Sequence, residues 1–174
     1  MIKHPGGMDQ TKKLIELAGL IPPARILDLG AGDGETVRLL SECGFIAAGI
    51  DKEPGPGVEY GDLLHTPYRD GSFDAVISEC ALFISGEREQ GLKEAWRLLS
   101  KGGKLLYADV WFVTEEEIYL LLQTCGFQHI SLTDVTQKWQ EYYIQSIWDG
   151  TVVMPDCDIP RKKCRYYLIA GEKK

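Results

Sequence analysis

The sequence has few basic residues for its acidic content. It contains 19 lysines and arginines against 26 aspartates and glutamates, which gives a formal net charge of -7. A nucleic-acid interface normally needs a basic face, because the phosphate backbone is anionic. The dense basic cluster Arg161–Lys163, followed by Arg165, is expected to be a solvated segment that leads into a strand. We therefore expect no nucleic-acid partner.

Long apolar runs and paired cysteines are also missing. No stretch is long enough to span a bilayer, and Lys3, His4 and Pro5 interrupt the region where a signal peptide would need apolar residues. The five cysteines are scattered, without a Cys-x-x-Cys pair. These absences predict free thiols, no metal centre, no membrane association and a cytoplasmic location.

Alternating apolar segments and turn residues indicate an α/β fold. A chain of 174 residues that is 44% hydrophobic can bury a core as one domain without a disulfide or metal. The order of the segments predicts a mostly parallel sheet with helices on both faces. The expected strands are 26–29, 45–50, 58–60, 73–78, 104–110, 127–133 and 164–170, and the expected helices are 9–19, 35–43, 88–99, 115–124 and 139–148.

A glycine-rich loop follows the first expected strand. Ligands of open α/β sheets bind beyond the carboxyl ends of the strands, so this loop is the first place to look for a site. Gly30, Gly32 and Gly34 allow a tight turn and a close approach of backbone to ligand. The spacing is Gly-x-Gly-x-Gly, and Glu35 occupies the place of the third glycine of a dinucleotide-binding loop. A dinucleotide is therefore disfavoured.

Two carboxylates near this loop indicate the kind of ligand. Asp28 lies two residues before the first glycine, where it would repel a pyrophosphate but suit a ligand with an ammonium group. Asp51 ends the second expected strand, about 20 residues further on, where an acid can bond ribose hydroxyls. Together these features favour a nucleoside that carries an amino acid.

Five segments together resemble the motifs of class I S-adenosylmethionine-dependent methyltransferases of the methyltransferase-11 type. They cover the glycine loop, the ends of the second and fourth expected strands, the Gly-Asp-Leu turn, and the turn before the fifth strand. These segments are Ile26–Gly34, Gly49–Asp51, Gly61–Leu63, Phe73–Ser78 and Leu98–Leu105.

This resemblance implies both the fold and the cofactor. It implies a Rossmann-like, mostly parallel seven-stranded sheet whose last strand is antiparallel. Residues 1–24 would form an N-terminal lid and helix, 25–110 the cofactor-binding core, and 111–174 the substrate side of a single methyltransferase domain. S-adenosyl-L-methionine would be the methyl donor and S-adenosyl-L-homocysteine the product.

The resemblance also implies roles for individual residues. The glycine-loop backbone would hold the methionine part and the sugar, and Asp28 would orient that loop toward the ammonium. Asp51 would bond the ribose hydroxyls, Asp62 would meet the adenine amino group, and Leu63 would lie against the ring. The expected cofactor-binding residues are Asp28, Gly30, Ala31, Gly32, Gly34, Asp51, Lys52, Asp62, Leu63 and Ser78.

Residues for the methyl acceptor are expected at both ends of the chain. Glu79 is a candidate general base at the end of the fourth strand. The segment around Cys80 is similar to the Ser-Asn-Cys-Val segment of arsenite methyltransferases, although Glu79 replaces the Asn. There the cysteine binds the metalloid as a thiolate, and Cys157 and Cys164 are possible further thiols. The expected acceptor-contacting residues are His4, as part of a lid, and the aromatics Trp111 and Tyr142.

The expected activity is methyl transfer to a small molecule by in-line displacement, in a monomer or homodimer. Aligning the acceptor with the methyl group can supply much of the catalysis, so a general base is optional. Two alternatives remain open: an S-adenosylmethionine-binding module without catalysis, and a metalloid methyltransferase that uses Cys80. A nicotinamide-linked oxidoreductase is the least favoured reading, because of the glycine spacing.

Overall fold

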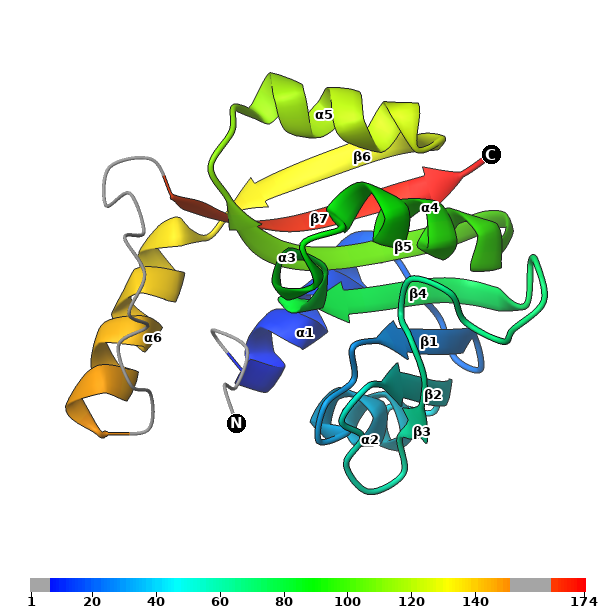
Figure 1. Ribbon diagram of the computed structural model, residues 1–174, viewed down its shortest axis with the longest axis horizontal. Helices are drawn as coiled ribbons and strands as arrows, with labels where there is room; N and C mark the ends of the chain where they lie inside the picture. The colour runs from blue at the N-terminus through cyan, green and yellow to red at the C-terminus, as the bar shows by residue number, and fades with distance from the viewer. Residues whose placement is uncertain (1–6, 151–163) are drawn as a thin grey trace.

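The computed structural model describes residues 7–150 and 164–174. His4, Cys157 and the basic cluster Arg161–Lys163 lie outside these ranges. Figure 1 shows one sheet with helices packed around it. The strands are β1 Arg25–Leu29, β2 Ile46–Asp51, β3 Glu59–Tyr60, β4 Phe73–Glu79, β5 Leu99–Trp111, β6 Phe127–Asp134 and β7 Arg165–Lys173, and the helices are α1 Gly7–Ala18, α2 Glu35–Glu42, α3 Ala81–Ser85, α4 Arg88–Leu98, α5 Glu115–Thr124 and α6 Thr136–Trp148.

The seven strands form one mixed sheet in the order β3-β2-β1-β4-β5-β7-β6. β1, β2, β3, β4 and β5 pair in parallel, whereas β7 runs antiparallel between β5 and β6. This arrangement confirms the predicted sheet, including its antiparallel last strand. The chain leaves β1 toward β2 and later returns to β4 on the other side of β1, which makes the β1/β4 boundary the switch point where a ligand crevice opens.

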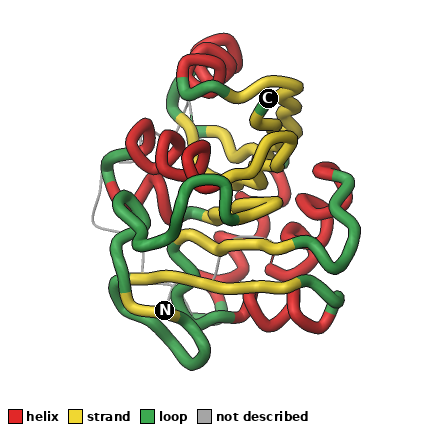
Figure 2. Tube along the Cα trace, turned by 90° about the vertical axis from the view of Figure 1, so that its right-hand side faces the viewer, coloured by secondary structure: helices red, strands yellow, loops and turns green. Residues whose placement is uncertain are grey.

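Apolar side chains cover both faces of the sheet, because strands with two covered faces are apolar on both sides. One face packs against α1, α2 and α6, through Leu14, Leu40 and Trp139. The other packs against α3, α4 and α5, through Leu82, Leu92 and Ile118. Figure 2 shows helices on both sides of the twisted stack of strands. The sheet thus separates two apolar cores. Packing in both cores fixes the positions of the strand ends that carry the polar residues.

Most predicted elements are confirmed, and the differences lie at their ends. β5 begins at Leu99 rather than at residue 104, because Leu99 already pairs with Phe73 across an irregularity in β4. β7 continues to Lys173, whose ammonium donates hydrogen bonds of 2.8 Å to the carbonyls of Trp96 and Leu99. The predicted cap of α5 is present: the hydroxyl of Thr114 accepts from the Glu117 amide in a capping box.

Candidate active site

A cavity of about 590 Å³ lies at the carboxyl ends of β1, β2 and β4. Figure 1 shows these three strands pointing to the same edge, beside α2 and α3. The volume falls within the range of about 300–1,000 Å³ that small-molecule sites usually occupy. The lining residues are Asp28, Gly30, Ala31, Gly32, Asp33, Glu35, Thr36, Asp51, Lys52, Glu53, Asp62, Leu63, Glu79, Cys80, Ala81, Ile84 and Ser85.

The glycine loop is held against the end of β2. The amides of Gly30 and Ala31 both donate to the carbonyl of Ile50, at 2.9 and 3.1 Å. Gly30 has a φ of +83°, and a Cβ there would collide with the Cβ of Ala81. Glycine is therefore required at this position by the close approach of α3 as well as by the backbone conformation.

Asp51 connects the second strand to the glycine loop. One carboxylate oxygen accepts from the Gly32 amide at 2.9 Å, and the other accepts from the Glu53 amide at 2.8 Å. A carboxylate oxygen has two lone pairs, so each oxygen can still accept a hydrogen bond from a ligand in the cavity. Asp51 is thus fixed in orientation and still able to bind hydroxyl groups.

Asp62 is also fixed as an anion at the cavity wall. Its carboxylate accepts from the Leu64 amide at 2.9 Å and lies 3.2 Å from the ammonium of Lys52. The backbone hydrogen bond from Leu64, assisted by Lys52, lowers the pKa of Asp62 below its usual value. Leu63 lines the cavity beside it. This end of the cavity therefore offers a hydrogen-bond acceptor next to an apolar surface.

Asp28 is the most deeply buried carboxylate of the site, with 3% of its surface exposed. Burial raises the pKa of Asp28 well above the ordinary value, and the nearby charges of Glu79 and Asp51 raise it further. A buried acid next to two like charges is destabilised in its ionised form, and a bound cation would relieve that repulsion.

Glu79 lies at the end of β4 and contacts two helices. The hydroxyl of Thr11 in α1 lies 3.1 and 3.0 Å from the two carboxylate oxygens. The hydroxyl of Thr36 in α2 donates to one of them at 3.2 Å. These contacts bring together residues that are 68 and 43 positions apart in the sequence. Thr11 precedes the glycine loop in the sequence and Thr36 follows it, and their hydroxyls together hold the Glu79 carboxylate in place.

Cys80 occupies the sharp turn between β4 and α3. Its φ of +62° is in the left-handed region, which is uncommon for a residue with a side chain. Its sulfur lies 3.1 Å from the phenol oxygen of Tyr166, whose ring stacks on Trp139. Burial, followed by the charge of Asp109, raises the pKa of the Cys80 thiol to about 12. At neutral pH this side chain is a thiol rather than a thiolate.

The charges that line the cavity are strongly asymmetric. Seven of the described lining residues are acidic, and the single basic one is Lys52. A pyrophosphate would be repelled by such a wall, whereas a ligand with cationic groups would be attracted. The electrostatics therefore match an amino-acid nucleoside with a sulfonium and an ammonium, and they disfavour a dinucleotide.

Four residues expected in the site do not line the cavity. Ser78 is buried, and its hydroxyl donates to the Leu29 carbonyl at 2.9 Å, which ties β4 to β1. Gly34 is the N-cap of α2 and faces the loop that contains Pro56 and Val58. Trp111 is 1% exposed and packs against Tyr107 and Arg88 in the core. Tyr142 is half-buried on α6.

Several lining residues were not predicted. Ala81, Ile84 and Ser85 come from α3, a helix of five residues that is too short to show a periodic apolar pattern. Thr36 lies in the first turn of α2, directly after the glycine loop, and this position in the sequence is the signal that could have predicted it. Thr11 contacts Glu79 across the fold, and no local signal predicts that contact.

Metal-binding clusters and membrane-spanning helices are both absent from the described residues. Within 7–150 and 164–174, no group of three or more His, Cys, Asp or Glu side chains is arranged to hold a metal ion. In the same ranges, no helix has the length and apolarity needed to cross a membrane.

Comparison with known proteins agrees with the fold and the motifs. Residues 27–107 match the family model of the Methyltransf_11 methyltransferase domain. The demethylmenaquinone methyltransferase of Renibacterium salmoninarum is 29% identical over 117 residues, which are 59% of this chain and 49% of that protein. The arsenite methyltransferase of Aquipseudomonas alcaligenes is 42% identical over 50 residues, 29% of this chain and 14% of that protein.

A solved structure matches nearly the whole chain. The phosphoethanolamine N-methyltransferase 2 of Haemonchus contortus, solved with phosphomonomethylethanolamine and S-adenosylhomocysteine, superposes with a TM-score of 0.76. The match has 19% sequence identity and covers 98% of this chain but 53% of that one. The likeness shows the Rossmann-like methyltransferase fold. The chain spans about half the length of the first curated relatives it matches.

Proposed function

We propose that the chain binds S-adenosylmethionine in the cavity and transfers its methyl group to a small-molecule acceptor. The observation that carries this proposal is the cavity wall, where a glycine loop and seven carboxylates converge at the switch point of the sheet. The match of residues 27–107 to the methyltransferase-domain model supports the same reading. All lining residues fall between Asp28 and Ser85, within the segment expected to be the cofactor-binding core.

The residues of the cavity wall suit different parts of this cofactor. The backbone of Gly30 to Gly32 would lie against the sugar and the methionine part. Asp51 would accept hydrogen bonds from the ribose hydroxyls, and Asp62 would accept one from the adenine amino group beside Leu63. Asp28 would face the ammonium.

When bound, the cofactor supplies a methyl group on a sulfonium, which is a good leaving group. The work left to this chain is to align the acceptor and exclude water, which alone can account for several kcal/mol of barrier lowering. Ala81, Ile84 and Ser85 of α3 border the cavity and would bound the reacting centre. Residues 111–174 and the N-terminal segment would complete the acceptor side.

The metalloid alternative is less well supported by the site. A metalloid is bound by the thiolate form of cysteine, and burial raises the pKa of Cys80 to about 12 and that of Cys164 to about 11, so binding would carry the cost of removing these protons. We therefore propose an organic acceptor, with Cys80 as a neutral wall residue hydrogen-bonded to Tyr166. We also propose that the protein is cytoplasmic and that it is a monomer or a homodimer.

Calorimetry with S-adenosylhomocysteine and with NADH tests the cofactor. We expect S-adenosylhomocysteine to bind and NADH not to bind. Asp51→Asn is expected to weaken the binding by about tenfold, because it removes a charged acceptor of hydrogen bonds. Lack of binding by the wild type, or an unchanged affinity in the variant, would contradict the proposal.

Methyl transfer itself is tested with S-adenosylmethionine labelled on the methyl group. The acceptor panel consists of amines, phenols, carboxylic acids, thiols and arsenite. Transfer to one of the organic classes supports the proposal, whereas transfer to arsenite that is lost in Cys80→Ser would support the metalloid alternative. Tight cofactor binding without transfer to any class would indicate a binding module.

A further inference from the structure

We propose that Glu79 is part of the cofactor site rather than a general base. Its carboxylate, positioned by Thr11 and Thr36, binds the cofactor's α-ammonium group together with Asp28. This inference rests on the proposed function and assigns a role within the same cavity. It is carried by the position of Glu79 in the sheet, by its two hydroxyl contacts, and by the order of carboxylates along the cavity.

The strand register places Glu79 and Asp28 on one face of the sheet. Asp28 of β1 pairs with Ile77 of β4 in a parallel ladder. Side chains alternate along a strand, so Glu79 projects to the same face as Ile77, two positions nearer the carboxyl edge. This is the face that α1 and α2 cover, and both carboxylates line the cavity there. A single small cation can therefore meet both groups.

The order of carboxylates along the cavity matches the order of groups in the cofactor. Asp62 follows β3, Asp51 ends β2, Asp28 lies in β1 and Glu79 ends β4. Because the strands lie side by side as β3-β2-β1-β4, these four carboxylates form a row. With adenine at Asp62 and ribose at Asp51, the amino-acid part extends toward Asp28 and Glu79.

The contacts of Glu79 hold its carboxylate in place at the cavity wall. The hydroxyls of Thr11 and Thr36 lie within 3.2 Å of the Glu79 carboxylate. An ammonium has three N–H donors and can bond two carboxylates at once, whereas a sulfonium has none. The ammonium is therefore the cationic group that these carboxylates fit.

The basic charge of the described cavity wall lies away from Asp28 and Glu79. Lys52 is the single basic residue among the described lining residues, and it is paired with Asp62 at the other end of the row. Thr11 lies in α1, outside the segment 27–107 that the family model matches, and its hydroxyl contacts Glu79 at 3.0 Å.

Two probes separate this role from a general contribution to binding. S-adenosylhomocysteine has the amino-acid part, whereas 5′-methylthioadenosine keeps the adenosine and the thioether but lacks it. In calorimetry, Glu79→Gln is expected to weaken S-adenosylhomocysteine binding by about tenfold or more, because a charge-assisted hydrogen bond is lost. Binding of 5′-methylthioadenosine is expected to change by less than about twofold, since it does not reach the ammonium position.

Thr11 provides a matched pair of positioning variants. Thr11→Val keeps the shape and removes the hydroxyl, and it is expected to weaken S-adenosylhomocysteine binding by about threefold. Thr11→Ser keeps the hydroxyl and should restore the wild-type affinity. Neither should alter 5′-methylthioadenosine binding, which a merely structural role of Thr11 would change as well. Thermal unfolding of each variant confirms that the fold is retained.

Each outcome decides between named possibilities. If the wild type binds neither probe, the proposed function fails. If it binds both equally well, or if Glu79→Gln weakens both or neither, the ammonium assignment fails while the proposed function stands. If Glu79→Gln keeps its affinity but loses methyl transfer to the acceptor found in the panel, Glu79 is a general base after all.

Discussion

Two buried carboxylates at opposite ends of the sheet have opposite electrostatic environments. Asp28 at the carboxyl edge is 3% exposed, and Glu94 of α4 near the amino edge is 6% exposed. The pKa of Asp28 is raised by burial and by neighbouring carboxylates. Burial by itself would raise the pKa of Glu94 too, but hydrogen bonds from Arg97 and Thr66 outweigh it and lower that pKa. Two carboxylates with similarly small exposed surfaces thus have pKa values shifted in opposite directions.

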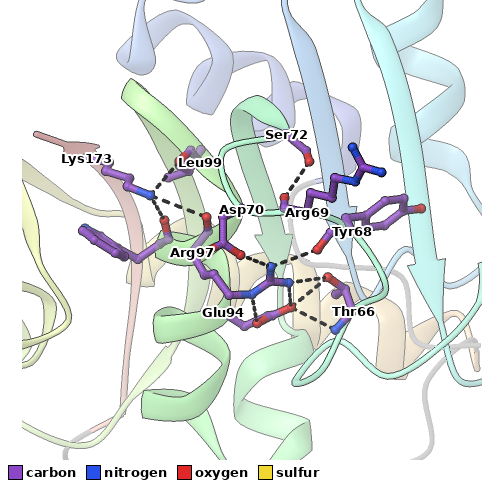
Figure 3. A network of polar contacts seen from close by, with 10 residues as sticks. Thr66, Tyr68, Arg69, Asp70, Ser72, Glu94, Arg97, Leu99 and Lys173 are labelled. Atoms are coloured by element: carbon purple, nitrogen blue, oxygen red, sulfur yellow. Dashed lines mark hydrogen bonds and ion pairs between the residues drawn. The ribbon is translucent and has the colours of Figure 1, made fainter.

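The surroundings of Glu94 show how the fold satisfies a structural acid. Figure 3 shows its carboxylate between Arg97 and Thr66. Arg97 donates to both of its oxygens, at 2.7 and 2.9 Å, and Thr66 donates from its amide and its hydroxyl at 2.9 and 2.7 Å. Arg97 also bonds Asp70 and the Tyr68 carbonyl, which joins the loop before β4 to α4. This network needs no ligand.

The surroundings of Asp28 lack such a partner among the described residues. Its charged neighbours are Glu79 and Asp51, which are themselves acidic. Charge that a fold leaves uncompensated is a mark of a functional site, because ligand binding then supplies the compensation. Burial alone therefore does not distinguish structural from functional acids, whereas the sign of the neighbouring charges does.

The largest expected effect comes from breaking the Glu94 network. Arg97→Met would leave a buried carboxylate with Thr66 as its remaining donor, and we expect the free energy of unfolding to fall by about 3 kcal/mol. Urea denaturation measures this loss. Glu94→Gln added to Arg97→Met should recover part of the stability, since the unpaired charge is then absent. The affinity for S-adenosylhomocysteine should stay within about twofold of the wild type, and a larger change would show that the two ends are coupled.

Asp28→Asn is expected to act in the opposite direction on stability. It removes a charge that is buried among like charges, so the ligand-free protein should become more stable by about 1 kcal/mol. The affinity for S-adenosylhomocysteine should fall by about tenfold, because the ammonium loses a carboxylate. Chemical denaturation and calorimetry on the same variant check both signs. A variant that loses both stability and affinity would mean that Asp28 has a structural role.

The ionisation of Asp28 and that of Glu94 should make the stability of the fold depend on pH in opposite directions. The pKa of Asp28 is raised in the fold from an ordinary value of 3.8, so its destabilising effect is absent below that value. It sets in as the pH rises through the folded pKa, because the folded state then has to release a proton that it binds more tightly than the unfolded state. Glu94 behaves oppositely: its lowered pKa stabilises the fold at high pH, and this is lost as the pH falls.

The experiment for this prediction is a denaturant series over pH on two proteins. As the pH rises through the folded pKa of Asp28, the wild type should lose stability relative to Asp28→Asn. The difference between the two should vanish at acid pH, where Asp28 is protonated in both states. A difference that does not vary with pH would show that the ionisation of Asp28 does not affect folding.

The smallest expected effect is at an exposed pair. The side chains of Lys52 and Asp62 are 63% and 37% exposed, so water already screens their attraction. Lys52→Ala should change the free energy of unfolding by less than about 0.5 kcal/mol, as is usual for surface ion pairs. Urea denaturation beside the Arg97→Met variant gives the direct contrast. A loss as large as that of Arg97→Met would mean that exposure does not decide the strength of these pairs.

Local patterns predicted most of the fold and part of the site. The strand-end glycines, Asp28 and Asp51 are predictable because a parallel strand, a tight turn and a strand-end acid each have a signature in a few consecutive residues. Ser78 shows the limit of this method. The sequence predicts Ser78 as a cofactor-binding residue at the end of the fourth strand. Neighbours in a strand face opposite sides of the sheet, however, and the hydroxyl of Ser78 donates to the Leu29 carbonyl instead.

Trp111 shows the same limit at the end of β5. An aromatic residue that follows a strand on the ligand side can face either the cavity or the core. Trp111 is on the same face as Tyr107, four residues earlier, and Arg88 of α4 lies 3.9 Å above its ring. The packing of α4 therefore decided its orientation, and the sequence around Trp111 holds no information about that helix.

The amino-acid sequence predicts the order of the elements, the glycine loop, and the acids that suit an amino-acid nucleoside. These features depend on backbone conformation and residue type, which act over a few residues. The contacts of Thr11 and Thr36 with Glu79, the shared face of Glu79 and Asp28, and the ion pair of Glu94 with Arg97 appear only in the folded structure. The contacts of Thr11 and Thr36 with Glu79 join residues far apart in the chain, and they arise only when helices pack against the sheet.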